Sequence, residues 1–181
     1  MADVDSNLYQ TILHPLKPLY NKDSKILILG SFPSVKTREY GFFYGHPQNR
    51  FWPIMEGLFN QTLSTNIDER RYFLLNHHIA VYDSIYQCDI IGSSDASIQN
   101  VIPTDLAIIF KNANIQQVFC NGATSYKYYQ KYHAKKSGIK GIKLPSTSPA
   151  NARYRLEDLL EEWRQILDYL ETSKNTLRLR E

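Results

Sequence analysis

The sequence predicts an α/β fold: a single-domain, three-layer sandwich around a four-stranded, mainly parallel sheet. Four short apolar runs of strand length recur along the chain, and segments with helical periodicity separate them. Strands that alternate with helices indicate a parallel sheet with helices on both faces. The 181 residues suffice for one domain with a substantial core, and the composition, 43% hydrophobic and 22% charged, is that of a globular protein.

The individual elements follow from the apolar pattern. The first strand, residues 25–29, is an unbroken apolar run that Gly30 ends. The helix that opens at residues 50–52 presents a broad apolar face as far as residue 59, and a helix over 68–76 offers Tyr72, Phe73 and Leu75 to the core. Strands are also expected at 79–82, 117–120 and 140–144, and helices at 104–111, around Tyr126, Tyr128 and Tyr129, and from 156 to 170.

The chain divides into three parts of unequal size. Residues 1–24 carry irregularly spaced apolar side chains interrupted by Pro15 and Pro18, so we expect a packed arm with one helical turn. Residues 25–171 form the domain, in which the Gly/Ser-rich stretch 88–103 is expected to be a connection. Residues 172–181 are polar and are expected to be a frayed tail.

Polar or small residues follow each of the four predicted strands. Because the carboxyl ends of parallel strands meet at one edge of a sheet, this edge is the predicted binding site. Ordinary turn and cap chemistry is the alternative explanation for any one cluster taken alone. The four clusters are Gly30-Ser31, Asp83-Ser84, Asn121-Gly122 and Ser146-Thr147-Ser148.

A loop rich in Gly, Pro and aromatic residues follows the first strand. It reads GFFYGHPQNRFW from Gly41 to Trp52 and places Phe42, Phe43 and Tyr44 in a row. Three adjacent aromatic rings in a loop suit a flat ligand, because they stack on nucleobases. Alternatively, the same rings wedge the loop onto the sheet.

This loop, placed after a strand that ends in GSFPS, resembles motif 1 of the uracil-DNA glycosylase superfamily. It is most similar to the branch that excises hypoxanthine, the DNA-deoxyinosine glycosylases; the mismatch-specific uracil glycosylases carry a related pattern. The stretch PSTSPANAR resembles motif 2, so the resemblance runs from about Ile26 to about Trp163. It implies that residues 25–171 form a uracil-DNA glycosylase-like domain that flips a base out of DNA and hydrolyses its glycosidic bond.

The resemblance assigns the catalytic role to Asn49, the amide of the HPQN run, because an uncharged amide can direct a water molecule. The alternative is a loop Asn bonded to its own backbone. This chain departs from the mismatch-uracil relatives at Phe32, where they carry an Asn two residues after the first motif Gly. That departure keeps open a non-catalytic binder of flipped or modified nucleosides.

A second set of residues is expected to bind the base. Tyr44 matches the aromatic residue that stacks on the extruded base in the relatives, and Phe32 and Phe43 complete the sandwich or shape the pocket floor. Asp83 can accept the N1–H of hypoxanthine and would oppose the N1 lone pair of adenine; a turn cap is the alternative. Asn121 bonds a base edge or caps the next helix. The set is Gly30, Ser31, Phe32, Phe43, Tyr44, Asp83 and Asn121.

The motif-2 stretch is expected to contact DNA. Its serines suit phosphate contacts, its Pro-Ala-Asn run can fill the gap left by a flipped nucleotide, and cations lie nearby. The alternative is that this stretch is only the loop that leads into the last helix. The residues are Ser146, Ser148, Pro149, Ala150, Asn151 and Arg153.

Composition narrows the function further. A net charge of +3 permits a polyanionic partner without requiring one, and Cys88 and Cys120 are too few for the four-thiolate cluster of the iron–sulfur branches. No signal peptide or membrane-spanning run is evident. We expect a cytoplasmic monomer, at the nucleoid in a bacterial cell, that excises hypoxanthine from double-stranded DNA without metal or cofactor. The rival within this class is a mismatch-type uracil-DNA glycosylase.

Overall fold

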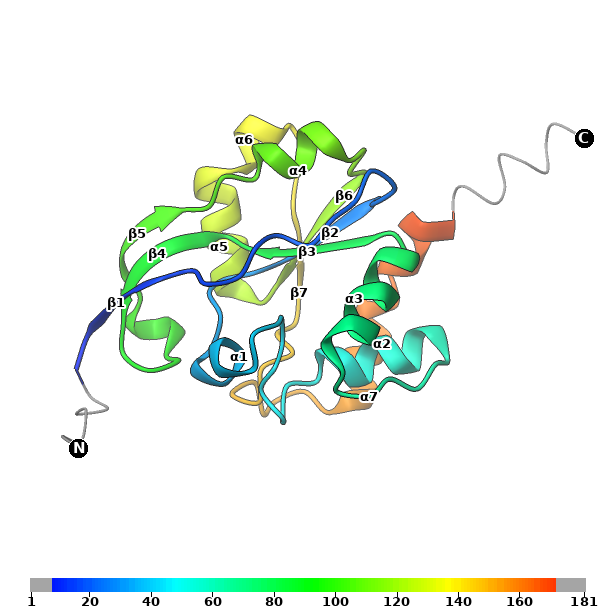
Figure 1. Ribbon diagram of the computed structural model, residues 1–181, viewed down its shortest axis with the longest axis horizontal. Helices are drawn as coiled ribbons and strands as arrows, with labels where there is room; N and C mark the ends of the chain where they lie inside the picture. The colour runs from blue at the N-terminus through cyan, green and yellow to red at the C-terminus, as the bar shows by residue number, and fades with distance from the viewer. Residues whose placement is uncertain (1–7, 172–181) are drawn as a thin grey trace, which may run out of the picture.

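A four-stranded parallel sheet runs through the computed structural model, which describes residues 8–171 (Figure 1). Its strand order is β3-β2-β6-β7, and all neighbouring strands are parallel. Every residue of the two strands β2 and β3 is buried, as expected for strands covered on both faces. The strands are β2 (Ile26–Gly30), β3 (Ile79–Asp83), β6 (Gln117–Asn121) and β7 (Ile142–Leu144). The predicted fold class is therefore confirmed.

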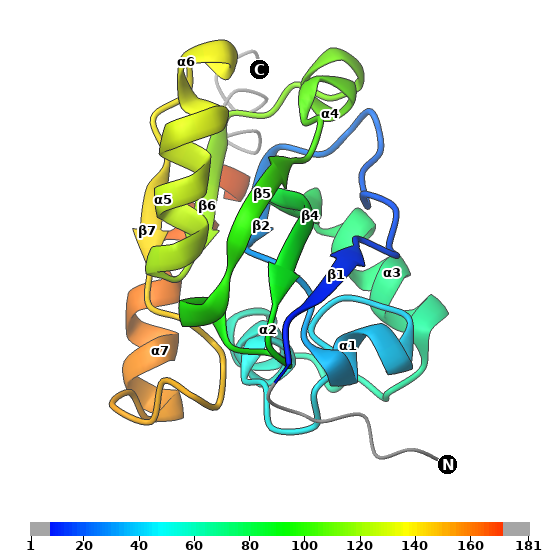
Figure 2. The ribbon, with the colours of Figure 1, turned by 90° about the vertical axis from the view of Figure 1, so that its left-hand side faces the viewer.

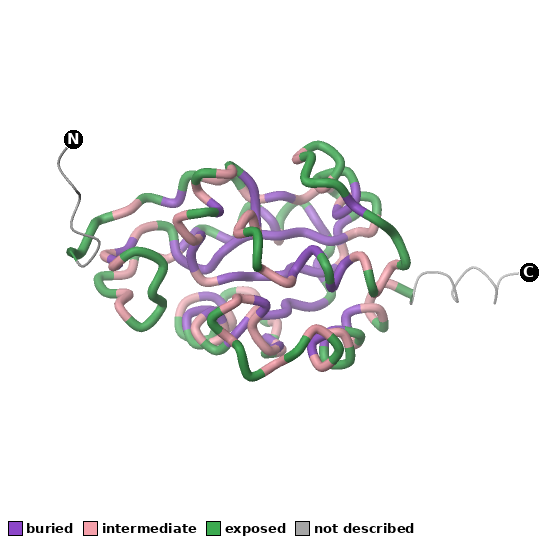
Figure 3. The backbone as a smooth tube through the Cα atoms, turned by 90° about the horizontal axis from the view of Figure 1, so that it is seen from below, coloured by how far each residue is buried: buried purple, intermediate pink, exposed green. Residues whose placement is uncertain are grey.

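Helices cover both faces of this sheet (Figures 1 and 2). One face carries α2 (Phe51–Phe59), α3 (Ile67–Asn76) and α7 (Leu156–Trp163), and α2 contacts α7 directly. The other face carries α4 (Ala107–Asn112), α5 (Ala123–Tyr132) and α6 (Ala134–Ser137). The tube in Figure 3 is buried through the middle of the molecule and exposed mostly in the peripheral helices and loops.

A second sheet overturns two of the expectations. Strands β1 (Gln10–Leu13), β4 (Ile85–Ile90) and β5 (Gln99–Pro103) form an antiparallel sheet in the order β1-β4-β5 (Figure 2). The arm therefore contributes a strand instead of a helical turn, and much of the predicted connection 88–103 is strand. Ile85, Cys88 and Ile90 pack beneath this sheet against Tyr128 of α5. Burial of that face is the physical reason for the sheet.

Several element boundaries also differ from the prediction. Helix α1 (Val35–Tyr40), which was not predicted, lies between β2 and the aromatic stretch that starts at Gly41, and its N-cap Ser34 accepts a hydrogen bond from Thr37 N at 3.1 Å. The short 3₁₀ helix η1 (Asp95–Ser97) interrupts the β4–β5 connection. Helix α4 begins at Ala107 rather than Thr104, because the Thr104 hydroxyl donates to the Asp83 carbonyl at 2.7 Å. Helix α7 ends at Trp163, and a turn separates it from a further helical segment, 166–171.

The predicted core contacts of α3 are correct only in part. Phe73 is buried, whereas Tyr72 is 71% exposed and does not enter the core. In the aromatic row of the first loop, Phe42 and Phe43 are both buried and only Tyr44 is half-buried. The frayed tail predicted for 172–181 and the first seven residues of the arm lie outside the described residues. Within residues 8–171, no helix is long and apolar enough to cross a membrane.

Candidate active site

A cavity of about 1080 Å³ lies at the carboxyl edge of the parallel sheet. The ends of β2, β3 and β6 and the loop that follows β7 all contribute to its wall. Every residue that the sequence predicts for catalysis, base binding or DNA contact lines this one cavity, so the geometry brings the fourteen together. Phe32 and Phe43 are themselves buried, which makes them part of its floor and wall.

Tyr44 stands out in the cavity for backbone strain and for an unpaired hydroxyl. Its φ is +54°, a left-handed conformation that is unfavourable for a bulky side chain. Its ring stacks on Phe51 with a centroid separation of 4.0 Å, while its Oη is buried without a hydrogen-bond partner. Burial, and secondarily the Asp83 carboxylate, raises the pKa of Tyr44 far above its usual value, so the hydroxyl remains a donor. Strain and unsatisfied polar groups of this kind gather at functional sites.

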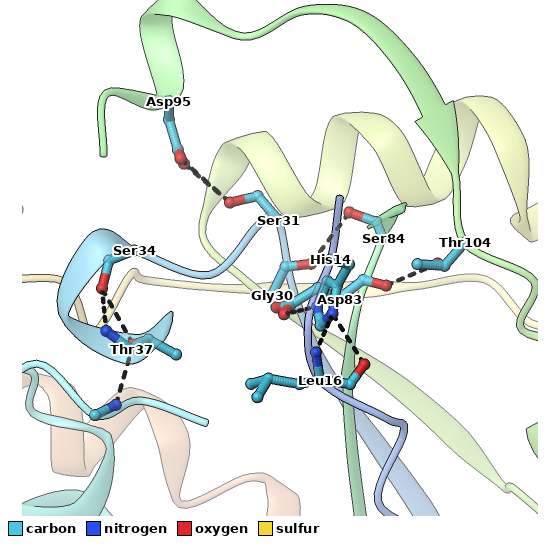
Figure 4. Close-up of polar contacts among 11 residues, drawn as sticks. His14, Leu16, Gly30, Ser31, Ser34, Thr37, Asp83, Ser84, Asp95 and Thr104 are labelled. Atoms are coloured by element: carbon cyan, nitrogen blue, oxygen red, sulfur yellow. Dashed lines mark hydrogen bonds and ion pairs between the residues drawn. The ribbon is translucent and has the colours of Figure 1, made fainter. Parts of the chain in front are cut away.

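The Asp83 carboxylate is fixed in the cavity floor. Its Oδ2 accepts a hydrogen bond from His14 Nε2 at 2.6 Å, and both side chains are buried (Figure 4). Its Oδ1 lies against Gly30, where a Cβ atom would approach that oxygen to 2.2 Å. Glycine at position 30 is therefore a steric requirement of this carboxylate. The turn-cap alternative for Asp83 finds no support, because the carboxylate contacts His14 from the arm.

Asn49 forms a hydrogen bond with nearby backbone, which is the alternative given above to a catalytic role. Its Oδ1 accepts a hydrogen bond from Phe51 N at 2.9 Å, at the start of α2. This contact fixes the orientation of the amide, with the carbonyl toward the helix and the NH₂ group turned elsewhere. Among the described residues, the Asn49 Nδ2 has no hydrogen-bond partner, and Asn49 lines the cavity.

Asn121 connects two parts of the site. Its Nδ2 donates to Thr147 Oγ1 at 2.9 Å, and its Oδ1 accepts from Thr147 N at 3.0 Å. The helix-cap alternative is therefore wrong, because the N-cap of α5 is Gly122 and no side chain caps this helix. The paired hydrogen bonds hold the loop after β7 against the end of β6.

Arg50 also holds this loop, and the sequence prediction of the site did not include it. Its guanidinium donates to the backbone carbonyls of Ser148 at 2.7 Å, Asn151 at 2.9 Å and Tyr154. Its own backbone N–H donates to Thr147 O at 3.0 Å. We identified Arg50 only as a helix-opening residue, and no local pattern indicates carbonyl partners about one hundred positions away.

The polar side chains of the loop after β7 are partly engaged within the loop. Ser146 Oγ accepts from Ser148 N at 3.1 Å, Ser148 Oγ accepts from Ala150 N at 3.2 Å, and Asn151 Nδ2 donates to Ser146 O at 3.0 Å. Each serine hydroxyl keeps its own hydrogen to donate. Ala150 and Arg153 are exposed at the cavity rim.

Two further groups line or support the cavity without having been predicted. His14 is the partner of Asp83, and Asp95 of η1 accepts a hydrogen bond from Ser31 Oγ at 3.2 Å. Partial desolvation beside the cavity raises the pKa of Asp95, although the residue is exposed overall, and the Ser31 hydrogen bond opposes that rise. Within residues 8–171, no group of three or more His, Cys, Asp or Glu residues is placed to hold a metal ion. Both cysteines are buried and unpaired.

Comparisons with known proteins agree with this fold. Residues 17–171 match the sequence profile of the uracil DNA glycosylase superfamily. A Methanosarcina barkeri protein named hypoxanthine DNA glycosylase is 30% identical over 141 residues, which are 75% of this chain and 86% of the relative. A protein of the same name from Methanosarcina acetivorans is 26% identical over 148 residues, which are 81% of this chain and 92% of the relative.

A solved structure shows the same fold. The solution NMR structure of a candidate uracil DNA glycosylase from Methanosarcina acetivorans superposes with a TM-score of 0.72 and 24% sequence identity. The superposition covers 86% of this chain and 96% of that chain.

Proposed function

This chain belongs to the uracil-DNA glycosylase superfamily, and we propose that it is a monofunctional DNA glycosylase that removes hypoxanthine, the base of deoxyinosine, from double-stranded DNA. The names of the two Methanosarcina relatives support this substrate. Hypoxanthine arises by deamination of adenine, so the activity is one of base excision repair. The base inside a duplex is inaccessible, and the enzyme must therefore flip it into the cavity.

The observation that carries the proposal is the buried Asp83 carboxylate beside Tyr44. A carboxylate accepts hydrogen bonds and donates none, so it pairs with the ring N–H of hypoxanthine and opposes the ring-nitrogen lone pair of adenine. A mismatched buried polar pair leaves groups unsatisfied, at about 1–3 kcal/mol for each neutral group. Tyr44, whose ring rests on Phe51, supplies a supported aromatic surface on which the flipped base stacks.

The chemical step needs a directed water molecule rather than a strong nucleophile. The glycosidic bond breaks with its electron pair leaving on the base, positive charge develops on the sugar, and water adds to that carbon and releases a proton. Asn49 Oδ1 accepts from Phe51 N with one lone pair, and the second lone pair can accept from the attacking water. The local hydrogen bond thus holds the amide in place for this role.

The loop after β7 supplies the DNA contacts in this proposal. Arg50 and Asn121 hold it at the cavity rim, where the exposed Arg153 and the serine hydroxyls, which keep a hydrogen to donate, would meet phosphate groups. The gap left by the flipped nucleotide is filled by residues 149–151. We extend the proposal to a monomer that acts in the cytoplasm, at the nucleoid in a bacterial cell, without metal or cofactor.

A substrate panel tests the proposal. The protein is incubated with identical duplexes that carry inosine, uracil or adenine at one position, and alkali then cleaves any abasic site. We expect strand cleavage for inosine, little or none for uracil and none for adenine. Faster release of uracil than of hypoxanthine would favour the mismatch-uracil alternative. We expect the opposite, because uracil is smaller than hypoxanthine and covers less of the Tyr44 ring.

The catalytic assignment has its own test. Asn49→Ala should lower single-turnover excision by a hundredfold or more and leave duplex affinity nearly unchanged, because the amide acts on water in the transition state. If the wild-type protein instead bound the inosine duplex without turnover, it would be a non-catalytic binder of nucleosides. That alternative stays open because Phe32 stands where the mismatch-uracil relatives carry an Asn.

A further inference from the structure

The partner of Asp83 comes from the N-terminal arm. His14 directly follows β1, whose residues Ile12 and Leu13 pair with Cys88 and Gln87 of β4. His14 N continues the pairing with a hydrogen bond to Tyr86 O at 2.7 Å. The range that matches the superfamily profile begins at residue 17, so His14 reaches the site from outside the matched range.

The imidazole ring of His14 is held in one orientation. Its side chain is completely buried, and it packs against the rings of Tyr82 at 4.9 Å, Phe32 at 5.9 Å and Phe43 at 6.5 Å. Two of these three rings, Phe32 and Phe43, line the cavity themselves. The cavity lining includes Asp83, Phe32 and Phe43 but not His14, so the imidazole lies behind these residues and is joined to the site by its hydrogen bond to Asp83 (Figure 4).

The contacts of the two ring nitrogens together indicate where the hydrogen lies. His14 Nδ1 is 3.1 Å from Leu16 N and 3.0 Å from Leu16 O, so it can accept from the first or donate to the second. An ionised Asp83 carboxylate only accepts, which selects the neutral form with its hydrogen on Nε2 and Nδ1 accepting from the Leu16 N–H; in the charged ring Nδ1–H donates to the Leu16 carbonyl. In both states Nε2 donates to Asp83 Oδ2. The arm therefore presents Asp83 with a donor whatever the charge of the imidazole.

This arrangement divides the two carboxylate oxygens between two tasks. Oδ2 is occupied by His14, and Oδ1 lies over Gly30, within reach of the cavity that Asp83 lines. We propose that His14 is a positioning residue for substrate choice: it holds Asp83 so that Oδ1 accepts the ring N–H of the flipped base. The inference deepens the proposed function and rests on it.

Without this donor, Asp83 would lose its fixed orientation. A carboxylate that is free to rotate no longer holds Oδ1 where it can accept the ring N–H of the flipped base. Discrimination between hypoxanthine and adenine would then weaken at the base-reading step, while the water-directing group Asn49 would be untouched.

A matched pair of variants separates donation from packing. His14→Gln keeps an N–H donor at the end of a flexible side chain, whereas His14→Met fills a similar volume without one. We expect at least a tenfold loss in kcat/KM for inosine in His14→Met, a smaller ratio of inosine to adenine excision, and recovery of most of both in His14→Gln. In an Asp83→Ala background, His14→Met should cause no further loss, because the acceptor that His14 orients is then absent.

Each outcome decides between alternatives. Equal impairment of a folded His14→Met and His14→Gln would reduce His14 to packing and overturn the inference, as would wild-type excision and selectivity in His14→Met. If His14→Met fails to fold, nitrogen NMR of histidine-labelled wild-type protein decides: a neutral ring with its hydrogen on Nδ1 overturns the inference. Failure of the wild-type protein to release hypoxanthine would instead refute the proposed function.

Discussion

Tyr44 combines left-handed backbone, a stacked ring and a buried hydroxyl without a partner. A buried donor left unsatisfied costs about 1–3 kcal/mol, so stability alone would favour phenylalanine at this position. The retention of tyrosine is consistent with a donor that finds its partner only when substrate is bound. Local rules are expected to fail in this way at functional sites.

Tyr44→Phe should therefore change stability and activity in opposite directions. We expect an unchanged or higher melting temperature and a three- to tenfold lower rate of hypoxanthine excision, since one neutral hydrogen bond contributes about 0.5–1.5 kcal/mol. Tyr129→Phe is the matched control: its Oη donates to Ile139 O at 2.7 Å outside the cavity. This control should lose stability and keep activity; loss of stability in Tyr44→Phe would contradict the account.

Gly30 is the other residue whose identity the site requires. Gly30→Ala places a Cβ atom 2.2 Å from Asp83 Oδ1, which His14 prevents from moving away, so we expect a loss of about 1–3 kcal/mol in unfolding free energy. The next contacts, Asp83 Cγ and Tyr44 Oη, lie at an ordinary 3.5 Å.

The same change in an Asp83→Ala background should therefore cost almost nothing. Urea unfolding of Asp83→Ala and of the double variant measures this directly. An equal loss from Gly30→Ala in both backgrounds would show that the conflict lies elsewhere than at the carboxylate.

The residues of the cavity were predictable where strand-end geometry or a long motif indicated them. Asp83 and Asn121 follow buried strands, and the carboxyl ends of parallel strands must meet at one edge. His14 and Arg50 were not predictable in the same way. A lone histidine in a proline-interrupted arm carries no local signal, and the partners of Arg50 are backbone carbonyls of a distant loop.

The strands also differ in how well the local sequence predicts them. Strands of the parallel sheet are continuous apolar runs, so local pattern identifies them. Strand β1 pairs with β4 across more than seventy positions, and β4 pairs with β5 through irregular register, so a Gly/Ser-rich segment is strand only because of its partners. Pairing of this kind overrides local propensity. It is also what delivers His14 to the site.

The end of α5 gives a prediction about pH. His133 is buried, its Nε2 lies 3.3 Å from Ser84 O, and burial lowers the pKa of its imidazole. The unfolded chain then binds a proton near pH 6.5 while the folded chain does not, so stability falls as the pH drops below about 6.5. His133→Gln removes this titration and keeps a donor for Ser84.

Urea unfolding between pH 5 and pH 8 measures the effect. We expect the unfolding free energy of His133→Gln to depend less on pH below 6.5 than that of the wild type. The lowered pKa values of Asp89 and Asp158 contribute only at more acidic pH, which separates their effect. Parallel wild-type and variant curves over this range would contradict the assignment to His133.

At the scale of the molecule, two sheets and the loop after β7 produce one cavity. The parallel sheet supplies Gly30, Asp83 and Asn121. The antiparallel sheet supplies β1, which His14 directly follows, and Arg50 holds the loop after β7 in place. The fold class could be predicted from composition, periodicity and length, because these are properties of the whole chain. The placement of His14 by the arm depends on individual long-range contacts, which composition does not reveal.

The distribution of charge gives the last prediction. The net charge of +3 is too small to draw DNA from all sides, so we expect binding to depend on the cations that lie at the cavity rim. Arg153 is exposed there, on the loop that Arg50 and Asn121 hold in place. Arg153→Gln should weaken binding to different undamaged duplexes to a similar extent and reduce the slope of log affinity against log salt by about 1, as loss of one phosphate contact does.

Lys135→Gln is the matched control, because it removes the same charge from α6, on the side of the molecule away from α1 and the loop before α7 (Figure 1). Fluorescence anisotropy over a series of salt concentrations gives both slopes, and undamaged duplexes avoid turnover. We expect the control to keep the wild-type slope, since a cation that meets no phosphate releases no counterions on binding. Equal changes in the two variants would mean that net charge, and not contact at the cavity rim, governs the affinity for DNA.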